Sequence, residues 1–286
     1  MPWFPDFVAA AELARKQTRD DGLQDPAMHY LDALNGGDAH LLEQVWPGDV
    51  VVHDPKVGTV KGHRELRAFV KRNHEFLAAH HTRTEKVAST AAGDRAVYEI
   101  LAHLTDDDGR EISWPVAVVA ESSDDLSVEF RSYCAVWPAL AQPSVRPAIL
   151  GPDDVRFPGS VGRYQSAIAA GDVDAVTSAF EADGYYREAF GSDPLHRGTS
   201  ELRAFFERGF AAGGGIGLEP CAVTDDGVCC ALEYNLTRWG RHPVPSQAGL
   251  LVHERGPDGL LAAVRAYDDI APPPEVGAGD QRSADR

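Results

Sequence analysis

The chain has 286 residues, of which 43% are apolar and 25% are charged, the proportions of a soluble globular protein with a buried core. Lys and Arg number 27 against 44 Asp and Glu, and the formal net charge of −17 excludes nucleic acid and anionic membranes as expected partners. The four cysteines include no C-x-x-C pair, and we see no signal peptide or membrane-spanning run, so we expect a cytoplasmic protein.

A long internal repeat organises the chain. Residues 62–69 read GHRELRAF and residues 198–205 read GTSELRAF, and further matches keep an offset between 132 and 136 residues. An offset this long indicates one domain that was duplicated and fused, rather than a solenoid. The predicted segments are an extra helix within 1–25, copy one at 26–141, a Pro-rich linker at 142–159, copy two at 160–274 and a flexible tail at 275–286.

Each copy begins with helices and ends with strands. In copy one, Pro26 marks a helix start, Gly36-Gly37 ends that helix, and Asp38 is the predicted cap of the next one. The remaining elements are a strand at 50–54, a helix at 62–79 and strands at 82–91, 95–105, 111–121 and 126–137. This order predicts an α+β domain with three helices packed on one face of a curved, mixed or antiparallel sheet.

The layout resembles the nuclear transport factor 2-like superfamily over about residues 26–138 and 160–272. The motifs that carry the resemblance are ALNGGD, ending at Asp38, a strand ending in His53-Asp54-Pro55, the GxxELRAF helix start, and a last strand with Tyr133. Members include ketosteroid isomerases, SnoaL-like polyketide cyclases, epoxide hydrolases and non-catalytic binding modules. The resemblance implies two cone-shaped domains with apolar pockets, joined as an intramolecular pseudo-dimer.

One spacing points further, toward ketosteroid isomerases. That family has a tyrosine on its first helix and an Asp-Pro pair 24 positions later, as Tyr30 and Asp54 are here. Tyr164 and Glu188 keep the same spacing of 24 in copy two. The resemblance implies that Asp54 and Glu188 are general bases and that Tyr30 and Tyr164 donate hydrogen bonds to a developing oxyanion. An apolar surrounding would raise the pKa of such a carboxyl toward the working pH and strengthen such a donor.

Other interpretations of these residues stay open. Tyr30 lies near Leu31 and Leu34 and could be plain core, and Asp54 before Pro55 is also common in strand-ending turns. Ketosteroid isomerases add a protonated aspartate on the third long strand as a second oxyanion donor. The corresponding positions here are apolar, namely Ala117, Val118, Leu250 and Leu251, so this donor is missing.

Epoxide opening is an alternative that needs a second acid near the substrate. Related epoxide hydrolases carry it on the strand after the third helix, where this chain has His80, His81, Arg83 and Glu85. Copy two offers Glu219 at the position equivalent to Glu85. Either glutamate could equally be a solvated strand residue.

Six further side chains are candidates for substrate binding: His53, His81, Trp114, His103, Asn235 and Tyr186. His103 and Asn235 occupy equivalent strand positions and could either line a pocket or pair across a sheet interface. Arg131 and Arg265 recur beside a tyrosine on the last strand, a pattern more typical of a sheet-face or inter-domain contact than of a catalytic group.

Metal and cofactor motifs are missing from the sequence. The 11 histidines form no H-E-x-x-H, and no G-x-G-x-x-G follows a strand. We expect neither a metal nor a cofactor.

The sequence favours a cofactor-independent general acid–base enzyme, an isomerase, cyclase or epoxide-opening enzyme acting on a small, mostly apolar molecule in secondary metabolism or in steroid- or polyketide-like chemistry. One copy could be inactive, and both a monomer and a further homodimer stay open. The alternative is a non-catalytic small-molecule-binding or scaffold protein of the same fold.

Overall fold

A computed structural model describes residues 25–136, 145–157, 159–189, 194–211 and 213–268. Residue contacts divide the chain into two units, Met1–Ser132 and Tyr133–Arg286, with the boundary inside the last strand of the first sheet. We call each sheet together with its helices the first and the second domain. The N-terminal helix and the C-terminal tail expected from the sequence lie outside the described residues. Within the described part, no helix is long and apolar enough to span a membrane.

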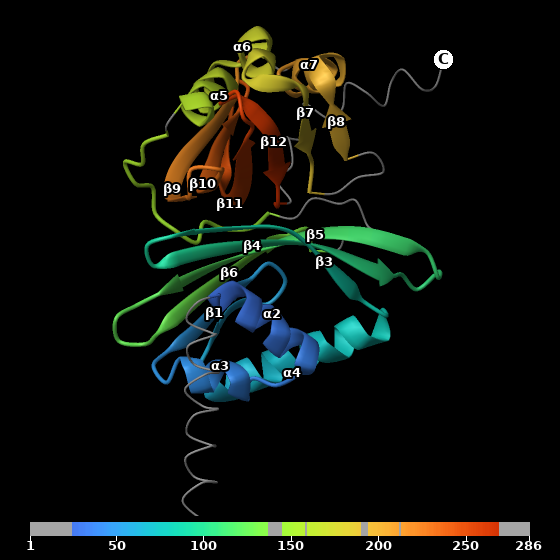
Figure 1. The fold of residues 1–286 in the computed structure, drawn as a ribbon, viewed down its shortest axis with the longest axis vertical. Coiled ribbons are helices and arrows are strands. Elements are labelled where there is room, and N and C mark those ends of the chain that lie inside the picture. The colour runs from blue at the N-terminus through green and yellow to red at the C-terminus, as the bar shows by residue number, and fades with distance from the viewer. Residues whose placement is uncertain (1–24, 137–144, 158, 190–193, 212, 269–286) are drawn as a thin grey trace, which may run out of the picture. The chain divides into compact units, whose positions relative to one another are not determined.

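The first domain places three helices on one side of a six-stranded sheet (Figure 1). The strand order is β2-β1-β6-β5-β4-β3. The helices are α2 (Pro26–Gly36), α3 (His40–Val45) and α4 (His63–Ala79), and the strands are β1 (Val50–Asp54), β2 (Gly58–Lys61), β3 (Arg83–Ala92), β4 (Arg95–Thr105), β5 (Glu111–Ser122) and β6 (Val128–Cys134).

The second domain repeats this arrangement with the strand order β8-β7-β12-β11-β10-β9. Its helices α5 to α7 lie together on one side of its own sheet (Figure 1). The helices are α5 (Gly159–Ala170), α6 (Val173–Ser178) and α7 (Gly198–Gly209), and the strands are β7 (Phe180–Arg187), β8 (Leu195–Arg197), β9 (Ile216–Asp225), β10 (Cys229–Trp239), β11 (His242–Arg255) and β12 (Leu261–Ala266).

Local sequence accounts for the helix ends. The side chain of Asp25 caps α2 by accepting from the Met28 N–H, and Gly37 ends the helix with a left-handed φ of 70°. Asp172 caps α6 in the same way by accepting from the Ala175 N–H. The equivalent expectation for Asp38 needs a small correction: it accepts from the His40 N–H, but Ala39 occupies the cap position of α3.

Both sheets are mixed, one of the two alternatives that the sequence left open. The first strand of each sheet pairs in parallel with the last, so that His53 lies opposite Arg131 and Arg187 lies opposite Arg265. The predicted element order lacked β2 and β8, which pair with β1 and β7 as short edge hairpins. The predicted α+β class with two copies of one domain is confirmed.

Each domain has its own hydrophobic core between the helices and the sheet. The first core includes Tyr30, Trp46 and Phe130, and the second includes Tyr164, Phe206 and Tyr234, all at most 5% exposed. Because side chains alternate along a strand, the residues next to the core positions face the other side of each sheet. Arg131 and Glu233 occupy such positions. The helix-covered side and the opposite side of each sheet therefore carry different chemistry.

Candidate functional site

Tyr186 is the centre of a polar cluster on the helix-covered side of the second sheet. It lies on β7, its ring stacks on Phe205 of α7 at 4.8 Å, and it makes an edge contact with Phe206 at 5.8 Å. These aromatic neighbours fix the ring beneath α7. The tyrosine was a predicted substrate-binding residue, and the contacts place it against the second hydrophobic core.

A glutamate and a histidine form a hydrogen-bonded pair next to Tyr186. His196 lies directly opposite Tyr186 in the β7–β8 hairpin. Glu188 is the residue after the end of β7, and its backbone N–H donates to the carbonyl of Pro194. Nε2 of His196 lies 2.8 Å from Oε1 of Glu188. The His196 ring also stacks on Phe205 at 4.3 Å. The pair lies near the surface, since the Glu188 side chain is 42% exposed and that of His196 is 12% exposed.

Tyr164 belongs to the same cluster. It lies on α5, is 1% exposed, and contacts Phe180 and Phe206 edge to face. Burial raises the pKa of its hydroxyl well above the usual value. Burial also raises the pKa of Tyr186, and the neighbouring Tyr164, Asp268 and Glu188 raise it further. The structure therefore gathers two sequence-predicted residues, Tyr164 and Glu188, around Tyr186.

A tyrosine–aspartate pair completes the cluster. The hydroxyl of Tyr234 on β10 donates to Oδ2 of Asp268 at 2.5 Å, and this oxygen also accepts from the Leu250 N–H at 3.3 Å. Burial is the main cause that raises the pKa of Tyr234, followed by the charge of Asp268. The pair fits because the facing residue on β11 is Gly249, whose Cβ would come within 2.5 Å of the Tyr234 ring.

The corresponding positions of the first domain are apolar. The strand registers align Val52 with Tyr186 and Val60 with His196, because each first strand pairs with its last strand and its hairpin partner in the same way. The repeat aligns Cys134 with Asp268. The polar cluster therefore occurs in the second copy, and the first copy shares only the aligned positions Tyr30, for Tyr164, and Asp54, for Glu188.

Tyr30 and Asp54 take part in local contacts of the first domain. Tyr30 is 1% exposed, stacks on Phe130 at 4.5 Å, and its hydroxyl lies 3.4 Å from the Ser132 hydroxyl. Oδ1 of Asp54 accepts from the backbone N–H groups of Lys56 and Val57 at 2.9 and 2.8 Å, which closes the turn between β1 and β2. Their catalytic roles stay a prediction.

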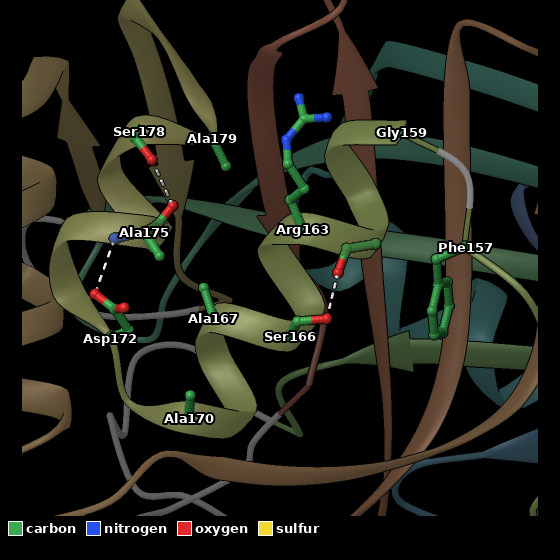
Figure 2. A pocket seen from close by; sticks show the side chains of 11 residues that line it. Phe157, Gly159, Arg163, Ser166, Ala167, Ala170, Asp172, Ala175, Ser178 and Ala179 are labelled. Carbon is green, nitrogen blue, oxygen red and sulfur yellow. Dashed lines mark hydrogen bonds between the residues drawn. The ribbon is translucent and has the colours of Figure 1, made fainter.

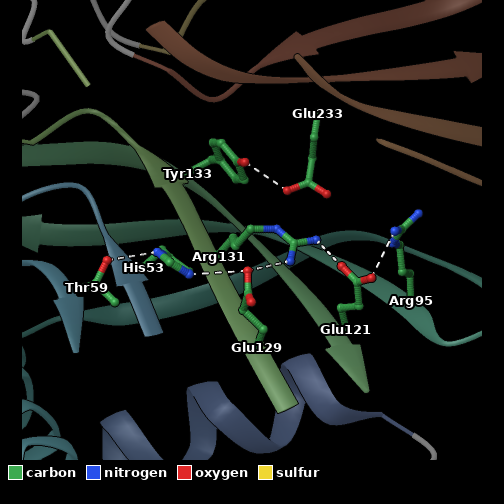
Figure 3. A network of polar contacts seen from close by, with 8 residues as sticks. All are labelled: His53, Thr59, Arg95, Glu121, Glu129, Arg131, Tyr133 and Glu233. Atoms are coloured by element: carbon green, nitrogen blue, oxygen red, sulfur yellow. Dashed lines mark hydrogen bonds and ion pairs between the residues drawn. The ribbon is translucent and has the colours of Figure 1, made fainter. Parts of the chain in front are cut away.

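His53 belongs to a charged network on the other side of the first sheet (Figure 3). Its ring nitrogens lie 3.2 Å from the Thr59 hydroxyl and 3.2 Å from a Glu129 oxygen. Arg131, only 1% exposed, bonds to both Glu129 and Glu121. The His53 hydrogen bond and the Arg131 charge lower the pKa of Glu129 to about 2, although burial opposes this. Its neighbour Val52 packs in the first core, so His53 points away from that core.

The other predicted binding residues are dispersed. Trp114 contacts Phe76 of α4 edge to face at 6.2 Å. His81 follows α4 with a left-handed φ of 49°. The ring of His103 lies 3.5 Å from Glu85 and 3.6 Å from Glu111.

Asn235 was predicted to line a pocket or to pair across an interface. Its Nδ2 donates to the carbonyl of Leu150, which ties the segment before α5 to β10, and the residue is 3% exposed. The second acids considered for epoxide opening, Glu85 and Glu219, are both exposed.

A surface groove of about 660 Å³ lies over α5 and α6 (Figure 2). Small residues such as Gly162, Ala167 and Ala175 form most of its wall. Three of its polar side chains serve their own helices: Ser166 donates to the Gly162 carbonyl, Ser178 donates to the Ala175 carbonyl, and Asp172 caps α6. The groove therefore lacks the convergent polar groups of the Tyr186 cluster.

Metal binding finds no support in the described ranges. Among those residues, no group of three or more His, Cys, Asp or Glu side chains is placed to hold a metal ion.

Comparison with known proteins identifies the domains. A family model described as a SnoaL-like domain matches residues 27–130 and again residues 161–269, which together make up most of the chain. The chain belongs to the SnoaL-like family. Each domain of the fold is thus one SnoaL-like copy, as the repeat predicted. No curated protein matches the chain.

Solved structures of similar fold resemble one SnoaL-like copy at a time. A putative polyketide cyclase from Sinorhizobium meliloti is 21% identical over 38% of this chain and 94% of its own length, with a TM-score of 0.33. A Catenulispora acidiphila protein of ketosteroid isomerase-like fold, in complex with trimethylamine, is 17% identical over 40% of this chain and 88% of its own length, with a TM-score of 0.34. A SnoaL-like protein of unknown function from Burkholderia thailandensis is 18% identical over 37% of this chain and 87% of its own length, with a TM-score of 0.32.

Three residues of the cluster were missed from the sequence: His196, Tyr234 and Asp268. His196 lies in a strand of three residues, too short for a periodic pattern. The repeat itself contained a usable signal, because His196 and Asp268 replace Val60 and Cys134 of copy one. A polar residue in one copy where the other copy has an apolar one indicates a role that only one copy performs.

Proposed function

We propose that this protein is a cofactor-independent general acid–base enzyme for a small, mostly apolar molecule, with its working site in the second domain. The observation that carries this proposal is the position of Tyr186, which lies among Tyr164, Glu188 and Asp268 while packed against the aromatic residues of α7. Clusters of titratable groups with shifted pKa values are typical of active sites.

The tyrosines are suited to stabilising an oxyanion. The hydroxyls of Tyr164 and Tyr186 are protonated at neutral pH, as tyrosine ordinarily is, and burial raises their pKa values further, so they can donate to a substrate oxygen. Donors that act in a dry surrounding on a developing negative charge contribute about 100-fold to 1000-fold each to the rate. A carbonyl whose oxygen becomes an enolate oxygen matches these donors.

The Glu188–His196 pair supplies the basic centre. A positioned base contributes about 100-fold to 10,000-fold when it removes a proton next to such a carbonyl. Proton removal and return without a cofactor corresponds to isomerisation or cyclisation, the chemistry that the resemblance implies. The pair joins Glu188, the base predicted from the sequence, to His196, which the sequence did not single out.

A second candidate function is epoxide opening. This reaction needs two acidic groups within reach of one substrate, and Glu188 and Asp268 are both close enough to Tyr186 to raise its pKa. The exposed Glu85 and Glu219 are less suited to this role.

The proposal can be tested without knowing the natural substrate. The probes are 5-nitrobenzisoxazole, which reports a base in an aromatic surrounding, and the exchange of α-protons of small cyclic ketones in heavy water. We expect the wild type to accelerate at least one of these reactions and Glu188→Gln to lose about 100-fold or more of that rate. Asp54→Asn tests the competing site in the first domain, and Glu207→Gln on the surface of α7 is the matched control.

The outcomes separate the alternatives. Loss of rate in Asp54→Asn with an unchanged Glu188→Gln would move the site to the first domain. A wild-type protein that accelerates neither probe nor opens a styrene oxide probe would favour the non-catalytic binding protein.

A further inference from the structure

On the proposed function, one atom of the Glu188–His196 pair takes a proton from the substrate. His196 lies on β8, opposite Tyr186 and one hydrogen bond away from Glu188. Val60 occupies the aligned position of the first domain, where the hairpin forms equally well. The histidine is therefore not needed to build this hairpin.

The hydrogen bond with Glu188 defines the chemistry of the ring. An ionised carboxylate only accepts hydrogen bonds, so Nε2 of His196 must carry the hydrogen that lies on Oε1 of Glu188. A neutral imidazole protonated at Nε2 has its lone pair on Nδ1. Within the described residues, no hydrogen bond is made to Nδ1 of His196, so this nitrogen is available to act as a base.

The ring is also held in a fixed orientation. His196 stacks on Phe205 with an interplanar angle of 19°, and Tyr186 stacks on the same phenylalanine with an angle of 28°. One aromatic side chain thus orients both the imidazole and a hydroxyl donor. A base and an oxyanion donor on one support keep their separation constant, which favours reaction between correctly placed groups.

We propose that His196 is the catalytic proton carrier of the second domain and that Glu188 is its positioning residue. In the reaction, the C–H bond next to the substrate carbonyl breaks and Nδ1 of His196 takes the proton. The electron pair of that bond moves to the carbonyl oxygen, which accepts hydrogen bonds from the tyrosine hydroxyls. Where a C=C bond is conjugated with the enolate, the imidazolium then returns the proton to the far carbon of that dienolate, and the electron pair moves back from the oxygen so that the carbonyl re-forms. The Glu188 carboxylate offsets the imidazolium charge in between.

The test is chemical rescue of His196→Gly in the full-length protein, measured with the probe on which the wild type is active. We expect the variant to lose about 100-fold of the rate and added imidazole, in the millimolar range, to restore at least about 10-fold. The same imidazole should leave the wild type unchanged. Imidazole should not restore the rate of Glu188→Gln, because that variant keeps the His196 ring and lacks the carboxylate that orients it. Glu188→Asp, which keeps a carboxylate, should retain part of the wild-type rate.

A second measurement does not depend on activity. Long-range proton–nitrogen NMR spectra of ¹⁵N-histidine-labelled wild type should show His196 as the Nε2-protonated tautomer, and Glu188→Gln should change its signals. A wild-type His196 ring protonated at Nδ1 would overturn the proposal. Because this measurement uses the wild type, it decides the question even if His196→Gly does not fold.

The result that overturns the inference differs from the result that overturns the proposed function. If Glu188→Gln is inactive while His196→Gly keeps its rate, Glu188 itself is the base. If His196→Gly folds, is inactive and cannot be rescued by imidazole, His196 is not the proton carrier. If the wild type accelerates no probe, the enzyme function fails as a whole.

Discussion

Nε2 of His253 accepts a hydrogen bond from the Gln165 side chain at 3.0 Å, while its Nδ1 donates to the Cys230 carbonyl at 3.0 Å. The ring is fully buried on β11 and lies edge-on to Tyr164 at 5.4 Å. With one nitrogen donating and the other accepting, the ring must be neutral. Burial is the main cause that lowers the pKa of His253 from 6.5 to about 4, and the Arg255 and Arg265 charges add to it.

This histidine should make the second domain sensitive to mild acid. Its folded pKa lies below its unfolded pKa, so the stabilisation is complete above pH 6.5 and is lost as the pH falls toward about 4. The shift corresponds to about 3 kcal/mol of unfolding free energy at neutral pH. We expect urea unfolding measured across this range to show a weaker pH dependence for His253→Gln than for the wild type. His40→Gln, a change at a side chain 65% exposed, should behave like the wild type.

Gly249 should tolerate no side chain. A Cβ at this position would lie 2.5 Å from the Tyr234 ring and 2.6 Å from Oδ2 of Asp268. Neither side chain can move away without breaking the hydrogen bond between them. We expect Gly249→Ala to lower the unfolding free energy by about 1–3 kcal/mol, as overpacked cores do. Gly209→Ala, where a Cβ meets nothing within 4 Å, is the control and should be neutral or slightly stabilising. Equal stability of the two variants would contradict the close packing of the Tyr234–Asp268 pair.

The Tyr234–Asp268 hydrogen bond should contribute measurably to stability. Tyr234→Phe removes the donor and leaves the carboxyl group of Asp268 with one fewer partner in the domain interior. Hydrogen bonds to charged groups contribute about 1.5–3 kcal/mol, and we expect a loss of that order in urea unfolding. Tyr164→Phe is the matched control, because the described residues make no hydrogen bond to the Tyr164 hydroxyl. A larger loss for Tyr164→Phe than for Tyr234→Phe would contradict this assignment.

Glu129 should protect the first domain against strong acid. The His53 hydrogen bond is the largest cause that lowers its pKa to about 2, so its stabilisation is present above 4.5 and is lost as the pH falls from 4.5 toward 2. Because its side chain is 37% exposed, water screens the network, and we expect Glu129→Gln to cost only about 1 kcal/mol at neutral pH. In thermal melts between pH 4.5 and pH 2, the variant should lose less stability than the wild type. Glu75→Gln, at a side chain 62% exposed, should leave the melting profile unchanged.

Much of the fold could be predicted because its signals are local and occur twice. The strands at 95–105 and 111–121 were recognisable from β-branched runs, and the repeat transferred each element to the other copy. β2 was missed because Gly58–Lys61 has one buried residue and no apolar run. The parallel pairing of β1 with β6 joins segments far apart in sequence, and no local pattern encodes it.

The candidate site could be predicted only in part. The spacing of 24 residues pointed to Tyr164 and Glu188, since it spans a short, local part of the chain from α5 through α6 to the end of β7. The spacing could not show that Glu188 and Asp54 have different surroundings. Glu188 accepts a hydrogen bond from His196, whereas Asp54 closes a turn. That difference arises from partners on other strands, and only the three-dimensional structure brings those partners together.

The parallel pairing of first and last strands has a consequence for folding during synthesis. Val50 cannot find its partner Val128 until nearly all of the first domain has left the ribosome, and Phe180 has to wait likewise for Leu261. Such long-range closure makes folding slow and leaves strand edges unpaired in the meantime. Since each sheet is closed by a strand from its own half of the chain, the first half can complete its sheet while the second is still being translated. We expect staggered closure of this kind to reduce strand exchange between the two similar halves, a known hazard for tandem copies of one fold.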